Sequence, residues 1–223
     1  MYKRQGLQIL AGLAKDRSTA ELVNVVPSSK PSDAYKAVAD KAKEFLPSYM
    51  HHWMDRSVCK RTVMTIPYNA TKDSSRKYIR EALLEKKIDP TTDELTQVVN
   101  AVYQSMDSIV PGPMQVMRWI KKHVGLYIRN GAKEVQWVTP SGFIVNQRRD
   151  NIETKQMELQ LLGRTQVRLP TGKSTPSPTK HKSSTAPNYI HSFDASILHR
   201  SFTQFDDCLL YTSPSPRDLY RSR

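Results

Sequence analysis

The sequence predicts a mostly helical α+β fold, and three features of its apolar pattern are the reason. Apolar residues recur at helical spacing through most of residues 6–131, alternate with polar residues in 135–169, and return to helical spacing from residue 188. The chain has 223 residues, 38% of them hydrophobic, so it is long enough for one or two domains with a core. No run approaches about eighteen consecutive apolar residues, and we expect no membrane span.

The first half of the chain is expected to be a series of helices. They cover residues 6–16, 34–46, 50–70, 74–87, 90–109 and 114–130. Ser32 or Asp33 would be the N-cap of the second helix, and Pro67 should bend the end of the third because proline lacks a backbone N–H. Between the first two helices, residues 23–33 have a strand-like run followed by a loop.

The second half predicts two strand pairs and a final helix. A hairpin is expected over residues 135–147, and a further strand pair over residues 156–169. Residues 170–187, PTGKSTPSPTKHKSSTAP, have the composition of a flexible basic loop. Residues 188–202 then return to helical spacing.

The chain is strongly basic, with a formal net charge of +13. Such an excess favours a polyanionic partner such as nucleic acid or nucleotides, although a basic soluble protein without such a partner has the same composition. A non-enzymatic, helical DNA-binding protein is therefore one alternative. The two cysteines, Cys59 and Cys208, are too few for a disulfide framework or a cysteine metal cage.

Both ends of the chain have a composition foreign to the rest. Residues 2–5 can be encoded by TATAAGAGACAG, and the reverse complement of that DNA, read from its second base, begins with the Cys-Leu-Leu-Tyr found at residues 208–211. The tail that follows resembles the translation of a transposase sequencing adapter. We therefore expect residues 1–5 and 208–223 to be non-native, adapter-derived segments.

Four side chains with a common spacing indicate a nucleotide site. Arg56, Lys60, Met64 and Tyr68 recur every four residues, so on a helix they form one slowly turning row. Arginine and lysine suit phosphates, a methionine suits a base, and a tyrosine suits a ribose. The plainer interpretation is a solvated basic face with Met64 and Tyr68 packed in a core.

This pattern, within DRSVCKRTVMTIPYN, resembles the motif B helix in the fingers of phage-type, single-subunit DNA-directed RNA polymerases. Family A DNA polymerases share the Arg, Lys and Tyr spacing but have an aromatic residue in place of Met64, so a fragment of such an enzyme is a second alternative. Asn69 stands where the RNA polymerases usually have glycine. A third alternative, a basic ATP-utilising enzyme, lacks support because no glycine-rich phosphate loop is present.

Three further segments support the resemblance in the same order along the chain. Trp137–Phe143 resembles the family's WVTP-x-GF hairpin, and Ala186–Ser196 resembles its APNF-x-HS-x-DASH segment, with Ile197 in place of the last histidine. Gly6–Gln8 resembles the stretch just after motif A. The resemblance implies that His191 approaches the minor-groove side of the new base pair. Arg61, which points away from the row on the same helix, is expected to contact template phosphate.

The resemblance implies part of a right-hand polymerase fold, comprising the fingers and part of the palm. Its segments would be palm-to-fingers helices at residues 6–52 and the fingers with motif B at residues 53–131. A strand and hairpin region would follow at residues 132–169, a flexible basic loop at residues 170–187 and a palm segment at residues 188–207. The implied activity is DNA-templated joining of ribonucleotides, with Lys60 as the catalytic lysine and Arg56, Lys60, Met64 and Tyr68 binding the nucleotide.

The implied cofactor is Mg²⁺, as two ions held by the aspartates of motifs A and C. Those aspartates would fall before residue 6 and after residue 207, so we expect no metal ligands in this chain and no activity from the chain alone. The implied partners are template DNA, nascent RNA and ribonucleoside triphosphates, without a membrane, and the full-length enzyme would be a monomer. Its expected location is the cytoplasm of a phage-infected bacterium or, as the alternative, a mitochondrion.

Overall fold

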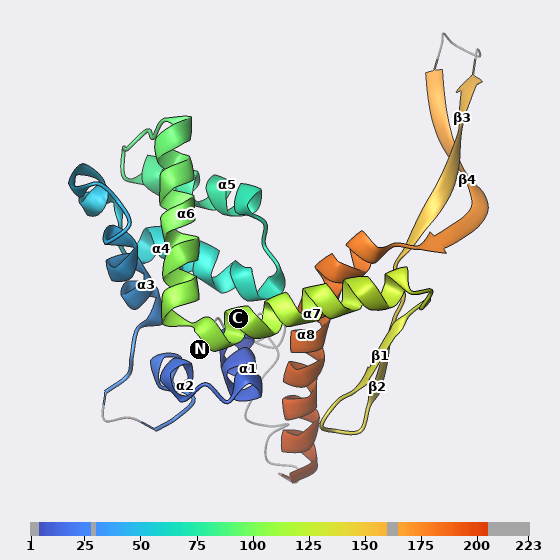
Figure 1. Cartoon of the computed structure of the whole chain (residues 1–223), viewed down its shortest axis with the longest axis horizontal. Coiled ribbons are helices and arrows are strands. Elements are labelled where there is room, and N and C mark those ends of the chain that lie inside the picture. Colours follow the sequence, from blue (N-terminus) through green and yellow to red (C-terminus); the bar gives the residue numbers. More distant parts are fainter. Residues whose placement is uncertain (1–4, 28–29, 160–164, 205–223) are drawn as a thin grey trace, which may run out of the picture.

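Helices make up most of the computed structural model, which describes residues 5–27, 30–159 and 165–204 (Figure 1). The helices are α1 (Gln5–Ala14), α2 (Arg17–Leu22), α3 (Ala34–Lys43), α4 (Arg56–Thr65), α5 (Lys72–Glu85), α6 (Thr92–Ile109), α7 (Pro111–Arg129) and α8 (Pro178–Gln204), with short 3-10 turns η1 (Ser48–Trp53) and η2 (Ile66–Tyr68). The strands are β1 (Val135–Val138), β2 (Ile144–Gln147), β3 (Asp150–Leu159) and β4 (Thr165–Pro176). The predicted class, α+β and mostly helical, is confirmed.

The core lies between the helices of the first half of the chain and α8. It is formed by apolar residues at helical spacing, among them Leu10 of α1, Val38 of α3, Val58 of α4, Ile79 of α5, Val98 of α6, Met117 of α7 and Ile190 of α8. Polar caps fix where these helices begin. The Asp33 carboxylate accepts the Tyr35 N–H at 3.0 Å, and Thr91 and Glu94 form a capping box at the start of α6. Five of the six helices predicted in this half are confirmed within a few residues.

Two predictions for the first half are wrong. Residues 23–33 were expected to begin as a strand, but the Asp16 carboxylate caps helix α2 just before them, and Asn24 then takes a left-handed conformation with φ of 60°. The single helix expected over residues 50–70 is three pieces, because Asp55 caps a new helix at Arg56 and Pro67 ends it.

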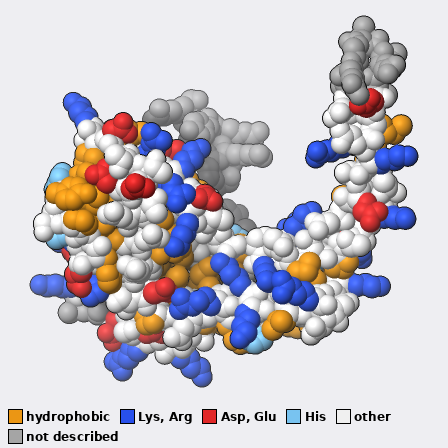
Figure 2. Space-filling model, turned by 45° about the horizontal axis from the view of Figure 1, so that its top comes forward, with side chains coloured by type: hydrophobic (Ala, Val, Ile, Leu, Met, Phe, Trp, Pro, Cys, Tyr) orange, Lys and Arg blue, Asp and Glu red, His pale blue; other side chains and the backbone are white. Residues whose placement is uncertain are grey.

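The strands form two separate antiparallel hairpins among the described residues (Figure 1). In the first, β1 pairs with β2 so that Trp137 lies opposite Val145, as the predicted hairpin requires. In the second, β3 and β4 form a long arm that projects away from the helices. Lys and Arg side chains stand along this arm and on the surface that joins it to the helical body (Figure 2).

The prediction of a flexible loop over residues 170–187 is wrong. Residues up to Pro176 continue β4, and α8 begins at Pro178. The helix begins here because the Ser177 carbonyl accepts the backbone N–H of His181, and because His181 and Thr185 are buried with hydrogen-bond partners. A segment with a polar composition is thus ordered through polar contacts. None of the described helices is long and apolar enough to cross a membrane.

Candidate nucleotide-binding site

Helix α4 and the turn after it carry the four side chains predicted to bind a nucleotide, here called the nucleotide row: Arg56, Lys60, Met64 and Tyr68. The first three share one side of α4 because they are four residues apart, and Tyr68 follows on η2. Arg56 is exposed, and the other three are partly exposed. Met64 and Tyr68 also pack against the core at their inner edges. The row therefore lies at the surface, with its apolar end anchored.

Arg56 is tied to the start of helix α3. Its Nε lies 2.6 Å from Oδ2 of Asp33, and its guanidinium carbon lies 5.4 Å from the centre of the Tyr35 ring. Burial raises the pKa of the Asp33 carboxyl, but the hydrogen bond from Arg56 and those from nearby backbone N–H groups outweigh burial and lower it. Because the Arg56 side chain is 49% exposed, its remaining N–H groups stay accessible to a phosphate.

The Lys60 ammonium group, in contrast to the Arg56 guanidinium, has no acidic partner among the described residues. Within the part of the chain that the structure describes, its ammonium group makes no hydrogen bond or ion pair. The side chain is only partly exposed, so it is held near the surface of α4 and is not sealed in the core. A partly desolvated, unpaired cation between Arg56 and Tyr68 is suited to bind an anionic group.

Tyr68 lies between two segments that are distant in sequence. Its ring stacks on the ring of His191 in α8, with centroids 5.0 Å apart and 22° between the planes. On another side, a Cβ built on Gly6 of α1 would lie 3.3 Å from the Tyr68 ring. Burial and the charge of Asp194 raise the pKa of the Tyr68 phenol, and the hydrogen bond with the Gly6 backbone only partly offsets them. The phenol is therefore neutral, and its O–H remains a donor, near neutral pH.

Asn69, directly after the row, has a left-handed backbone with φ of 65° and ψ of 32°. Glycine adopts this conformation most easily, and asparagine is among the few other residues that tolerate it. The Asn69 side chain also forms a long-range contact, because its Nδ2 donates to the Ser183 carbonyl of α8 at 3.0 Å. Asn69 therefore combines a backbone that favours glycine with a side-chain contact that glycine could not make.

The predicted WVTP hairpin packs on the same stretch of α8. Trp137 donates from Nε1 to Oγ of Ser192 at 2.9 Å, and its ring lies 5.7 Å from that of Tyr189. From β2, the buried Gln147 amide donates to Thr185 at 2.8 Å and accepts from Asn188 at 2.7 Å. Motif-like segments from three parts of the chain therefore meet on α8.

Arg61 lies on a different side of α4 from the row. Its Nη1 lies 2.7 Å from Oε2 of Glu81, and its guanidinium carbon lies 4.0 Å from the centre of the Tyr78 ring, both on α5. Its side chain is 58% exposed. The structure thus separates Arg61 from the nucleotide row and brings the row together with His191.

A model of the DNA-dependent RNA polymerase family matches residues 4–211. The chain belongs to this family. The prediction of a phage-type RNA polymerase is confirmed, and the match favours it over a family A DNA polymerase and over a non-enzymatic DNA-binding protein. The match also reaches into the segments predicted to be adapter-derived, which lie outside the described residues apart from Gln5.

Similar proteins include both mitochondrial and phage RNA polymerases. The chain is 28% identical over 206 residues to the mitochondrial DNA-directed RNA polymerase of Mus musculus, a match that covers 86% of this chain and 17% of the mouse protein. It is 30% identical over 222 residues to that of Schizosaccharomyces pombe, covering 86% and 19%. It is 25% identical over 254 residues to the T7 RNA polymerase of Escherichia phage T7, covering 88% and 29%. The chain therefore spans less than a third of the length of each of these relatives.

His191, next to the nucleotide row, lines a cavity of about 260 Å³ together with Asn188 of α8. The other side of this cavity is formed by Gln147 at the end of β2 and by Arg148 and Arg149, which follow it. Arg148 forms an ion pair with Asp150 at 2.9 Å. Polar and cationic groups thus surround the exposed face of His191. Sequence reasoning missed these arginines, although the run Gln147–Asp150 after the hairpin is visibly polar.

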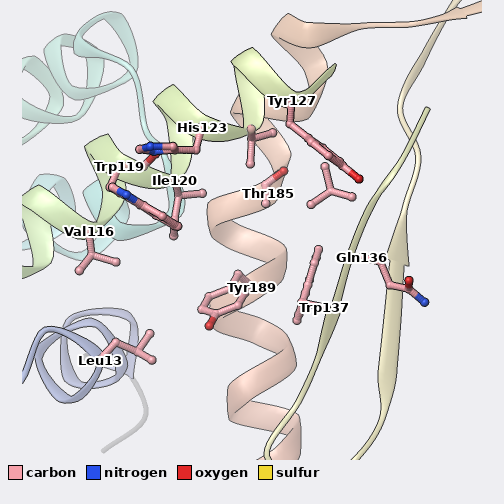
Figure 3. Close-up of a pocket in the computed structure, with 12 residues that line it drawn as sticks. Leu13, Val116, Trp119, Ile120, His123, Tyr127, Gln136, Trp137, Thr185 and Tyr189 are labelled. Carbon is pink, nitrogen blue, oxygen red and sulfur yellow. The ribbon is translucent and has the colours of Figure 1, made fainter. Parts of the chain in front are cut away.

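A second, apolar cavity lies between α1, α7, α8 and β1 (Figure 3). It has a volume of about 660 Å³, and α1, α7, α8 and β1 line it with Leu13, Trp119, Tyr127, Trp137, Tyr189 and other residues. None of the four residues of the nucleotide row lines it. It lacks the cations that a triphosphate needs, so the row is the stronger candidate for nucleotide binding.

The described residues near the row include neither a metal-ligand cluster nor a reactive thiol. Among the described residues, no group of three or more His, Cys, Asp or Glu side chains is placed to hold a metal ion. Cys59 of α4 is fully buried, and burial, together with the nearby Asp55 charge, raises the pKa of its thiol to about 12. Cys59 therefore packs as a small apolar residue.

Proposed function

We propose that this chain is the part of a DNA-templated RNA polymerase that binds the incoming ribonucleoside triphosphate. The observation that carries the proposal is the Tyr68–His191 stack, which places the end of the nucleotide row against the helix that carries the APNYIHS segment. Arg56 and Lys60 would bind the phosphates, Met64 the base and Tyr68 the ribose. The family relationship supports this assignment, and the open, unpaired Lys60 fits it.

The proposed reaction joins the nucleotide's α-phosphate to the 3′-oxygen of the RNA. A new oxygen–phosphorus bond forms as the bond to the pyrophosphate oxygen breaks, and the 3′-hydroxyl loses its proton to solvent water. Lys60 would neutralise charge on the triphosphate and donate a proton to the leaving pyrophosphate, as its unpaired ammonium group permits. Arg56 would share its guanidinium between Asp33 and the phosphates. Phage-type RNA polymerases generally use Mg²⁺, which stabilises the charge on the reacting oxygens when it is bound.

Nucleic acid would lie along the basic surfaces near this row. His191 would approach the new base pair, and the neighbouring Arg148 and Arg149 would face the duplex backbone from the cavity that the three residues share. Arg61, which is exposed on the α5 side, would contact template phosphate. The basic surface between the arm and the body agrees with such a path (Figure 2).

The relatives come from phages and from mitochondria, so the parent enzyme would act in a phage-infected bacterium or in a mitochondrion. We propose the bacterial cytoplasm, and a monomeric full-length enzyme, as in the prediction from sequence. Its partners would be template DNA, nascent RNA and ribonucleoside triphosphates.

The test is RNA synthesis on a DNA template by the polymerase that contains this segment. Lys60→Ala should lower kcat roughly 100-fold or more, the contribution typical of a positioned acid, while leaving template binding unchanged. Lys77→Ala is the matched control, because Lys77 is an exposed lysine on the neighbouring helix α5. Equal turnover in the two variants would show that Lys60 is not the catalytic lysine.

A further inference from the structure

The helix α8 has a gap in its backbone hydrogen bonds at the point where Asn69 reaches it. In an α-helix, the carbonyl of residue 183 accepts the N–H of residue 187. Residue 187 is a proline inside the helix and has no N–H to donate. The Asn69 side chain fills this gap, because its Nδ2 donates to the Ser183 carbonyl at 3.0 Å.

The gap and the Tyr68 contact lie along one line of α8. Ser183, Pro187 and His191 are each four residues apart, so they follow one another on the same side of the helix. Asn69 binds the first of them, and the adjacent Tyr68 stacks on the last. Tyr68, the last residue of η2, and Asn69, its C-cap, therefore contact α8 at two points that are two helical turns apart.

We infer that Asn69 is a positioning residue, which fixes the Tyr68 ring against His191 by bonding to the carbonyl that Pro187 leaves open. One contact alone would allow η2 to pivot about it, whereas two separated contacts set its direction. The left-handed backbone of Asn69 is required for this, because it turns the chain directly after Tyr68. Glycine would adopt the same backbone without strain, but it has no side-chain amide to donate.

The consequence for catalysis rests on the proposed function of Tyr68. If the Tyr68 hydroxyl contacts the ribose, then the residue that fixes the ring also affects the choice between ribonucleotides and deoxyribonucleotides. Asn69 would act on this choice through Tyr68, without touching the nucleotide itself.

The first experiment measures the stack directly, in the 223-residue chain without nucleotide. The NMR shifts of the His191 ring protons report the ring current of Tyr68, and Tyr68→Leu gives their value without that ring. Asn69→Gly should move these shifts most of the way to the Tyr68→Leu value. Asn69→Asp, which keeps the side-chain size but has no N–H, should do the same.

Asn24→Gly is the matched control. Asn24 is also an asparagine with a left-handed backbone, and its Nδ2 also donates to a carbonyl, that of Ser32, at 2.9 Å. It lies in the loop after α2, so its replacement should leave the His191 shifts unchanged. Equal shifts in Asn69→Gly and Asn24→Gly would overturn the inference.

The Pro187→Ala variant tests whether Asn69 acts because Pro187 leaves the Ser183 carbonyl without its helical donor. Alanine supplies the missing N–H to Ser183, so the Asn69 amide competes with the helix for that carbonyl and no longer fills a gap. In the Pro187→Ala background, Asn69→Gly should produce no further shift of the His191 protons. A shift of the same size in both backgrounds would overturn the inference, because Asn69 would then act by another route.

The second experiment measures ribonucleotide against deoxyribonucleotide incorporation in the polymerase that contains the segment. Asn69→Gly should raise relative deoxyribonucleotide use several-fold, and Asn24→Gly should not. The two experiments separate the two proposals: the NMR shifts alone decide whether Asn69 positions Tyr68. If the shifts change while selection does not, the positioning stands and the proposed role of Tyr68 in ribose selection fails.

Discussion

The Tyr68 and His191 rings lie face to face, 5.0 Å apart, although one belongs to the turn after α4 and the other to α8. The stack joins the two segments that the family resemblance treats as separate motifs. It also leaves the phenol oxygen next to the Gly6 backbone, at the end of the nucleotide row that is anchored on the core.

Removing the Tyr68 hydroxyl should relax the choice of sugar. Tyr68→Phe keeps the ring on His191 but loses one hydrogen bond, worth about 0.5–1.5 kcal/mol, so relative deoxyribonucleotide use should rise roughly 2- to 10-fold. The measurement is the ratio of kcat/KM values for the two nucleotides in the polymerase that contains the segment. Tyr127→Phe, an exposed tyrosine of α7 outside the row, should leave the ratio unchanged.

Adding a methyl group at Gly6 should disturb the support of Tyr68. A Cβ there would lie 2.8 Å from Cβ of Pro67, closer than real contacts allow. Gly6→Ala should therefore lower the free energy of unfolding by about 1–3 kcal/mol in urea denaturation. Gly12, in the same helix, has no atom within 4 Å of such a Cβ, so Gly12→Ala should instead raise stability by about 0.5–1 kcal/mol. Equal effects of the two substitutions would show that α1 does not press on Pro67.

Acid should destabilise the fold through two helix caps. Burial raises the pKa of the Asp16 and Asp55 carboxyls, but hydrogen bonds outweigh it and lower both to about 2, from Ser18 and Thr19 at Asp16 and from Lys86 and Ser57 at Asp55. A lowered pKa means that the stabilisation is complete above the unfolded-state pKa, about 4, and is lost as pH falls toward about 2.

The check is the free energy of unfolding between pH 5 and about 2. The Asp16→Asn and Asp55→Asn variants keep an oxygen that can cap the helix but carry no charge. Each should be less stable than the original chain at pH 5, and the difference should shrink in acid. A difference that stays constant with pH would contradict the prediction.

Cys59 should be unreactive in the folded chain. Its thiol is buried, and its pKa of about 12 leaves almost no thiolate at neutral pH. In a Cys208→Ser background, where Cys59 is the remaining cysteine, a thiol reagent should react slowly in buffer and fast in urea. Rapid labelling in buffer, with the circular dichroism spectrum unchanged, would show that α4 exposes this side.

Local signals explain which parts of the fold could be predicted from sequence. Helices α3 and α6 were predicted because apolar spacing, and for α3 the cap at Asp33, depend on residues a few positions apart. The β1–β2 hairpin followed from alternation and a turn. The family followed from the spacing of four residues on α4, together with the hairpin and the APNYIHS segment.

Long-range contacts explain what could not be predicted. The start of α8 depends on His181, whose Nε2 accepts the Arg149 backbone N–H at 3.1 Å. Arg149 precedes the β3–β4 arm in the sequence, and His181 follows it. The role of Asn69 depends on Ser183, which is 114 residues away in sequence. Composition indicated a loop at residues 170–187 because it does not reveal such partners. The roles of Arg56, Lys60, Met64, Tyr68, His191 and Arg61 stay predictions, as does the division into fingers and palm.

Because one helix, α8, carries contacts on two of its sides, it mechanically couples the regions on either side. Ser183 and His191 bind the end of the nucleotide row, while Asn188 and Ser192 bind the β1–β2 hairpin. If α8 rotates about its axis, both sets of contacts must move with it. Any twist of α8 would therefore move the Tyr68–His191 stack and the β1–β2 hairpin together.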